Sequence, residues 1–150
     1  MKIELTPVDV DGKPRDFDHP LSATAREVLL ATGALYDAVG FEEPWIGYLV
    51  VAGSQAVGTC GFKSPPSDGR VEIAYFTFPE YENRGLATQM AGQLIALAQG
   101  AAADVNIVAQ TLPERNASTR VLEKSGFRRV GTVDHPEDGE VWEWQLPRGG

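Results

Sequence analysis

The chain has 150 residues, a length that fits one domain, and its 43% hydrophobic and 23% charged residues are ordinary for a globular fold. A formal net charge of −8 argues against nucleic acid as the main partner, because phosphate contacts need a basic surface. The single cysteine, Cys60, excludes a disulfide framework within one chain, and no apolar run approaches the ~20 residues that span a membrane. The first residues lack the layout of a secretion signal, so we expect a cytoplasmic protein.

The first half of the sequence predicts one helix among four strands. Thr24 and Glu27 have capping-box spacing, which predicts the start of a helix that ends at Gly40. The helix is expected to direct one set of apolar residues inward, namely Val28, Leu29, Leu35 and Val39. β-prone runs predict the strands, at residues 2–8, 46–52, 56–63 and 71–78.

The second half predicts two helices and three further strands. Apolar residues recur at spacings of four, four and three, on one face of a helix, at Leu86, Met90, Leu94 and Leu97. Gly100 closes this helix, and Gly126 closes a shorter one over residues 117–125. The strands are expected at residues 105–111, 127–134 and 140–146. The order of elements predicts one mixed α/β domain with a central sheet.

Charge is unevenly distributed in the last third of the chain. Residues 113–130 hold five basic and two acidic side chains, whereas residues 134–143 hold five acidic side chains and no basic one. This pattern fits an anionic ligand near the first segment and a cationic ligand near the second. Charges scattered over solvated faces explain it equally well.

The junction between the strand ending near Phe78 and the helix beginning near Leu86 is the most informative segment. A strand that passes through a glycine-containing turn into a helix presents free backbone N–H groups and the positive end of a helix dipole. Gly85 permits close approach of a ligand, and Ala87 keeps the first helical turn small. The turn therefore suits a phosphate or pyrophosphate, although an ordinary tight turn has the same composition.

At this junction, Tyr81-Glu82-Asn83-Arg84-Gly85-Leu86-Ala87-Thr88 resembles the Gln/Arg-x-x-Gly-x-Gly/Ala signature of GNAT (Gcn5-related N-acetyltransferase) acyltransferases. About thirty residues later, the segment from Pro113 to Phe127 resembles the family's Asn-x-x-Ser…Glu-Lys-x-Gly-Phe segment. The two signatures occur in family order with a strand between them. The resemblance runs from about Val71 to the carboxyl terminus.

The resemblance implies an α/β (α+β) fold, as a single domain over residues 1–150 with a central, mixed, mostly antiparallel twisted sheet flanked by helices. It implies acetyl-CoA or another acyl-CoA as acyl donor, no metal, and an amine acceptor on a small molecule or a protein. Dimers are common among the relatives, so a homodimer is compatible with the resemblance. Neither nucleic acid nor a membrane is an expected partner. The coenzyme residues that it implies are Phe76, Thr77, Phe78, Asn83, Arg84, Gly85, Leu86, Ala87, Thr88, Asn116 and Ser118.

Two positions depart from the family signatures. Glu82 stands where Gln or Arg is usual, and the outward turn of its side chain toward Arg84 would accommodate it. In the second signature Arg115 holds the usual asparagine position, and Asn116 is shifted by one. Asn116 therefore has two possible roles, contact with the coenzyme or capping of the following helix.

Glu72 is the leading candidate for the general base. Strand alternation puts it on one apolar face with Ala74, Phe76 and Phe78, and some relatives are similar in placing a glutamate on this strand. The alternative is a glutamate at the strand end that lies in solvent or in a salt bridge. Many relatives carry a tyrosine acid on the last helix, where this chain has Leu122. The alternative to an enzyme is thus a non-catalytic acyl-CoA-binding sensor or partner module of the same fold.

The remaining polar residues give weaker expectations. Cys60 is expected in the core, and neither His19 nor His135 has metal-ligand spacing. Tyr75 and Tyr81 are expected to pack or to lie at the rim of the site. A cationic acceptor is expected to meet the acidic residues Asp134, Glu137, Asp138, Glu42 and Glu43, although a solvated hairpin tip explains each of them individually.

Overall fold

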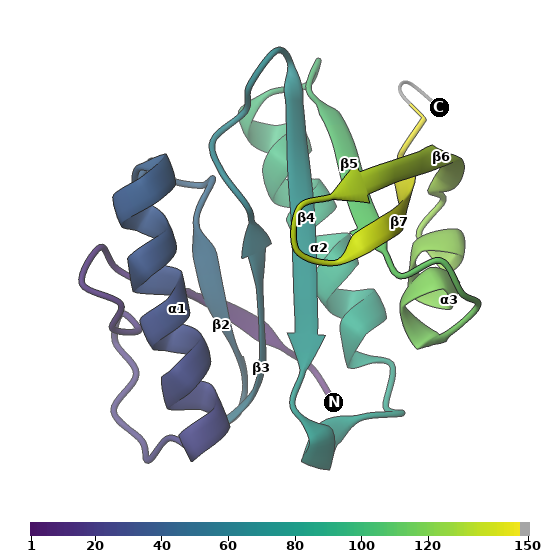
Figure 1. Cartoon of the computed structure of the whole chain (residues 1–150). Coiled ribbons are helices and arrows are strands. Elements are labelled where there is room, and N and C mark those ends of the chain that lie inside the picture. Colours follow the sequence, from purple (N-terminus) through teal and green to yellow (C-terminus); the bar gives the residue numbers. More distant parts are fainter. Residues whose placement is uncertain (148–150) are drawn as a thin grey trace.

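The computed structural model describes residues 1–147, so the last three residues of the expected domain lie outside the described part. Its elements, in chain order, are β1 (Glu4–Pro7), α1 (Ala23–Val39), β2 (Gly47–Ala52), β3 (Gln55–Phe62), β4 (Arg70–Thr77), the 3-10 turn η1 (Pro79–Tyr81), α2 (Leu86–Ala101), β5 (Asn106–Thr111), α3 (Ala117–Lys124), β6 (Arg128–His135) and β7 (Gly139–Gln145). Strands and α-helices follow one another as the sequence predicts (Figure 1).

The strands form one seven-stranded sheet in the order β1-β2-β3-β4-β5-β7-β6. Every neighbouring pair is antiparallel except β4 and β5, which run parallel, so the expected mixed and mostly antiparallel sheet is confirmed. The parallel pairing covers only Arg70–Glu72 against Asn106–Val108. Beyond Glu72 the backbone of β4 has no strand partner on the β5 side, and this interruption is where the site lies.

Helices cover both faces of the sheet. Figure 1 shows α1 in front of β2 and β3, and α2 behind β4. The expected apolar face of α2 is confirmed at Leu86, Met90 and Leu94, which are buried, and Leu97 packs against the same core. No helix in residues 1–147 has both the length and the apolar composition needed to cross a membrane.

The start and the inward face of α1 differ from the prediction. The helix begins two residues earlier than the Thr24–Glu27 pair implies, because the Ser22 hydroxyl accepts a hydrogen bond from the Ala25 N–H at 3.1 Å. Its buried residues are Ala25, Leu29 and Tyr36, whereas Leu35 is 38% exposed. Tyr36 sets this orientation, because its hydroxyl donates to the Val8 carbonyl and accepts from the Gly47 N–H.

Candidate active site

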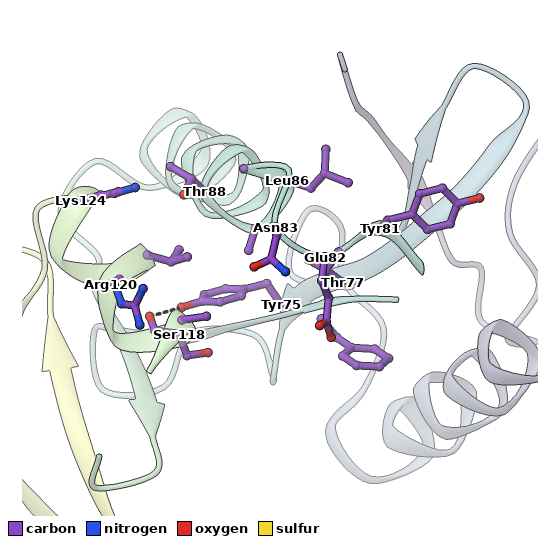
Figure 2. Close-up of a pocket in the computed structure, with 15 residues that line it drawn as sticks. Tyr75, Thr77, Tyr81, Glu82, Asn83, Leu86, Thr88, Ser118, Arg120 and Lys124 are labelled. Carbon is purple, nitrogen blue, oxygen red and sulfur yellow. Dashed lines mark hydrogen bonds between the residues drawn. The ribbon is translucent and has the colours of Figure 1, made fainter. Parts of the chain in front are cut away.

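A cleft of about 380 Å³ opens between the end of β4, the turn into α2 and the first turns of α3 (Figure 2). Most of the residues expected at the coenzyme line it, namely Phe76, Thr77, Asn83, Gly85, Leu86, Ala87, Thr88 and Ser118. Further lining residues are Tyr75, Tyr81, Glu82, Ala117, Arg120, Val121 and Lys124. The two signature segments, about thirty residues apart in sequence, thus form opposite walls of one cleft.

Three residues expected at the coenzyme do not line the cleft. Phe78 is 2% exposed, and its N–H donates to the Val57 carbonyl at 2.9 Å. The guanidinium of Arg84 lies 5.6 Å from the centre of the Tyr81 ring, and no described ion pair joins it to Glu82. The third, Asn116, faces a different pocket.

Asn116 caps α3. Its side-chain oxygen accepts a hydrogen bond from the Thr119 N–H at 3.1 Å, and the Thr119 hydroxyl accepts one from the Asn116 N–H at 2.9 Å. This reciprocal pair is a capping box, which satisfies two backbone donors that a helix start otherwise leaves free. Of the two roles that the sequence left open for Asn116, capping is the contact observed.

The turn into α2 leaves its backbone donors accessible. Asn83 and Gly85 both have left-handed backbone conformations, with φ of 64° and 74°, and Gly85 is the N-cap of α2. No side chain caps this helix start, so its first N–H groups are free to bind an anion. A Cβ at Gly85 would meet no atom within 4 Å, so the space beside this residue, which lines the cleft, is open.

Two cations on α3 extend the positive character of the cleft. Arg120 and Lys124 lie one helical turn apart, and both line it. Within residues 1–147 neither of them forms an ion pair, whereas Arg115 pairs with Glu123 at 3.2 Å. Sequence reasoning did not name this pair, although the excess of basic residues between 113 and 130 was the signal for it.

Tyr75 closes the inner end of the cleft. Its hydroxyl donates to the Ser118 carbonyl at 3.1 Å and thereby joins β4 to α3 (Figure 2). Burial raises the pKa of Tyr75 to about 12, so the phenol is protonated at neutral pH. Tyr75 packs against the core and also lines two smaller pockets, which agrees with the packing or rim role that the sequence suggested.

Glu72 lies on β4 outside the lining of this cleft. Its Oε2 atom is 2.6 Å from the Nζ of Lys63, and its side chain is 20% exposed. This buried oxygen makes no hydrogen bond of good geometry in the described structure, so the contact is an ion pair. The salt bridge, which the sequence left open as an alternative for Glu72, is the contact observed, and its partner is Lys63 of the adjoining chain segment.

Other expectations for single residues have clear outcomes. Cys60 is buried, as expected for a core residue, and burial raises the pKa of its thiol. Leu122 is completely buried, so its position in α3 supplies no acid to the cleft. In the described part of the chain, no group of three or more His, Cys, Asp or Glu side chains is arranged to hold a metal ion.

The acidic residues expected at the acceptor do not gather at one site. Asp138 lines a pocket of about 270 Å³ that Lys63 and Gln110 also line. Glu43 forms an ion pair with Arg15 at 2.9 Å and does not line the cleft. The remaining three, Asp134, Glu137 and Glu42, are exposed.

A known protein family matches most of this chain. A model of the acetyltransferase (GNAT) domain family matches residues 15–128. Among curated proteins, none matches the sequence at a significant level. Because the family match spans most of the chain, it establishes the family independently of any single relative.

Solved structures with the same fold include RimL, a ribosomal L7/L12 alpha-N-protein acetyltransferase in complex with coenzyme A, at a TM-score of 0.69 and 14% identity. The alignment covers 97% of this chain and 94% of that one. An acetyltransferase of the GNAT family from Streptococcus pneumoniae has a TM-score of 0.65 at 12% identity, over 99% and 100% of the two chains. The aminoglycoside acetyltransferase AAC(6')-Ib in complex with coenzyme A has a TM-score of 0.60 at 23% identity, over 86% and 78%. The sheet that opens between β4 and β5, the cleft and the family match together establish that the chain belongs to the GNAT acetyltransferase family.

Proposed function

We propose that this protein transfers the acetyl group of acetyl-CoA directly to a primary amine on a small molecule or a protein. The observation that carries the proposal is the cleft itself. Within residues 1–147, it combines uncapped backbone donors at the start of α2 with two cations on α3 that form no ion pair, beside the part of β4 that does not pair with β5.

Each part of the coenzyme has a matching surface in the cleft. The N–H groups of the turn and first residues of α2 would hold the pyrophosphate, because they combine free donors with the positive end of the helix dipole. Arg120 and Lys124 would neutralise further phosphate charge. The backbone of Phe76 and Thr77 would bind the amide groups of the pantetheine, since β5 does not pair with that edge of β4.

The chemistry requires one bond to form and one to break. The amine nitrogen attacks the thioester carbonyl, the C–N bond forms, and the C–S bond breaks with departure of the coenzyme thiolate. Glu72 is the proposed acceptor of the proton that the amine loses, because it shares a strand face with Ala74 and Phe76. Water would protonate the thiolate, which leaves readily without an acid on α3.

A second candidate function is binding without catalysis. The complete burial of Leu122, where many relatives have a tyrosine, and an acidic residue, Glu82, in the cleft lining both favour a coenzyme sensor. Such a module would bind acetyl-CoA and leave every amine unmodified.

Thiol release from acetyl-CoA, measured with a panel of amines beside calorimetric titration of the coenzyme, separates these functions. We expect binding together with amine-dependent thiol release. Binding without turnover on any amine would support the sensor, and absence of binding would reject both functions.

A further inference from the structure

A second hollow, of about 170 Å³, lies between α1 and strands β2 to β4. We call it the α1 trough, and its defining residues are Thr32 and Leu35 on α1, Gly47, Gly61 and Ala74 in the sheet, and Phe76 beside them. It is separate from the coenzyme cleft, yet it shares two residues of β4 with that cleft.

The floor of the α1 trough is a row of three small residues. Gly47 is the register partner of Gly61, and Gly61 is the register partner of Ala74, so the row crosses three strands. A Cβ at Gly61 would lie 2.6 Å from the Ile46 carbonyl oxygen, and one at Gly47 would lie 2.7 Å from the Thr32 methyl group. Larger side chains therefore do not fit in the floor without movement of the backbone or of α1.

Two large apolar side chains and two threonines, Thr32 and Thr59, are among the residues that line the α1 trough. Leu35 is 38% exposed on one side and Phe76 is 41% exposed on the other. Among the described residues that line the trough, none carries a charged side chain. Two large apolar side chains that face one hollow gain from contact with an apolar group, whereas a cation buried there would lack a partner.

The α1 trough meets the coenzyme cleft at Tyr75 and Phe76, which line both. Glu72 is two residues before Ala74 on the same face of β4, which is about 7 Å along a strand. A molecule in the trough thus presents one end to the place where the thioester is proposed to lie, near the proposed base. This continuity selects the acceptor substrate as the occupant.

We propose that the acceptor is a primary amine that carries an uncharged, compact apolar group, and that this group fills the α1 trough. The inference rests on the proposed acetyl transfer. It replaces the cationic acceptor that the acidic residues suggested, because none of these residues lines the trough, namely Asp134, Glu137, Asp138, Glu42 and Glu43.

Two amines of equal size test the inference. n-Hexylamine and 1,5-diaminopentane have the same number of non-hydrogen atoms, but the second ends in an ammonium group instead of a methyl group. We expect kcat/KM for n-hexylamine to exceed that for the diamine by about tenfold or more, after correction for the diamine's two amines. Equal rates, or preference for the diamine or a longer polyamine, would overturn the inference and leave the proposed function standing.

Two substitutions on α1 test whether the selectivity between the two amines depends on the α1 trough. Leu35→Glu adds a carboxylate to the wall of the α1 trough, whereas Leu30→Glu adds one to the same helix at a side chain that is 75% exposed and outside the lining. We expect Leu35→Glu to reduce the selectivity for n-hexylamine at least tenfold and Leu30→Glu to leave it unchanged. Equal effects of both substitutions would contradict the assignment.

A binding measurement distinguishes failure of the proposed apolar acceptor from failure of the proposed acetyl transfer. Titration of n-hexylamine into protein saturated with coenzyme A measures occupancy of the trough without turnover. Saturable binding that Leu35→Glu weakens and Leu30→Glu preserves would support the trough even if no amine reacts. Absence of such binding, in protein that binds acetyl-CoA, would overturn the inference.

Discussion

The carboxylate of Glu72 and the ammonium of Lys63 form an ion pair at 2.6 Å, one row beyond the floor of the α1 trough. We predict that Glu72→Gln lowers kcat about a hundredfold or more, because the amine loses its proton acceptor, and barely changes acetyl-CoA affinity. Steady-state rates and calorimetry measure the two effects. Glu143→Gln is the control, since Glu143 also forms an ion pair, with Arg70, on the same sheet. A normal rate in Glu72→Gln would reject the base.

Tyr75 links β4 to α3 through a hydrogen bond, and its protonation couples stability to pH. Its pKa is raised from 10.0 to about 12 by burial, so the folded protein retains this proton where the unfolded chain loses it. The resulting stability is fully present below pH 10 and is lost as the pH rises from 10 to 12.

We predict that Tyr75→Phe makes the unfolding free energy fall less steeply over that interval of pH, because the titrating group is gone. Below pH 10 the variant should be less stable by about 1 kcal/mol, the contribution of one hydrogen bond. Urea unfolding at several pH values measures both effects. An unchanged pH dependence would show that another group is responsible.

Single residues also mark where sequence reasoning reached its limit. Gly85 and its neighbours in the turn were predicted because their chemistry is local, a glycine before a helix start. The ion-pair partner of Glu72 was not predicted, because Lys63 lies on another chain segment and only strand pairing brings the two side chains together. The role of Arg120 and Lys124 likewise depends on how α3 faces α2, which no local pattern specifies.

At the scale of elements, the turn into α2 combines backbone conformation with binding. We predict that Gly85→Ala lowers the unfolding free energy by about 1 kcal/mol, the cost of a left-handed conformation for a residue with a Cβ. We expect the same change to weaken acetyl-CoA binding, because it adds a methyl group to the turn that lines the cleft. Gly92→Ala, inside α2, is the matched control, and it should raise stability. Equal affinity in the two variants would contradict an anion site at the turn.

The capping box of α3 predicts a stability effect without a direct binding effect. Asn116→Ala should lower the unfolding free energy by about 1 kcal/mol, whereas Asn116→Ser should retain most of the stability because serine is also a good N-cap. Denaturant unfolding measures this difference. Acetyl-CoA affinity in Asn116→Ser should equal that of the unaltered protein, and a marked loss would indicate contact between Asn116 and the coenzyme.

Helices could be predicted from the sequence where residues within the helix itself determine its start and its buried face. The spacing of Leu86, Met90 and Leu94 identified α2 and its buried face. The start of α1 was misassigned because Thr24 and Glu27 match a capping box, but Ser22 forms the cap. The inward face of α1 depends on the Tyr36 hydroxyl, whose partners lie in distant segments, and spacing alone does not reveal them.

At the scale of the whole molecule, the net charge of −8 opposes the approach of an anionic coenzyme, so the local cations must offset it. We predict that double substitution of Arg120 and Lys124 by alanine weakens acetyl-CoA binding and reduces its dependence on salt. Titrations between about 0.01 and 1 M salt suit this test, because the screening length shortens from about 30 to about 3 Å over that range. Arg128→Ala is the control, since Arg128 belongs to the same basic segment but not to the cleft. Equal salt dependence in both proteins would reject the assignment.

The order of elements along the whole chain followed from periodicity and turn residues. The position of β7 between β5 and β6 did not follow from these local patterns, because strand order is set by contacts between residues far apart in sequence. The opening between β4 and β5, on which the proposed function depends, is a property of that strand order and of a pairing that stops at Glu72.

The structure of the complex with acetyl-CoA is the most direct test of acetyl transfer in this cleft. The pyrophosphate is expected against the N–H groups at the start of α2, with the thioester at Phe76 beside the opening to the α1 trough. A coenzyme bound elsewhere, or a thioester directed away from β4, would contradict the proposed function.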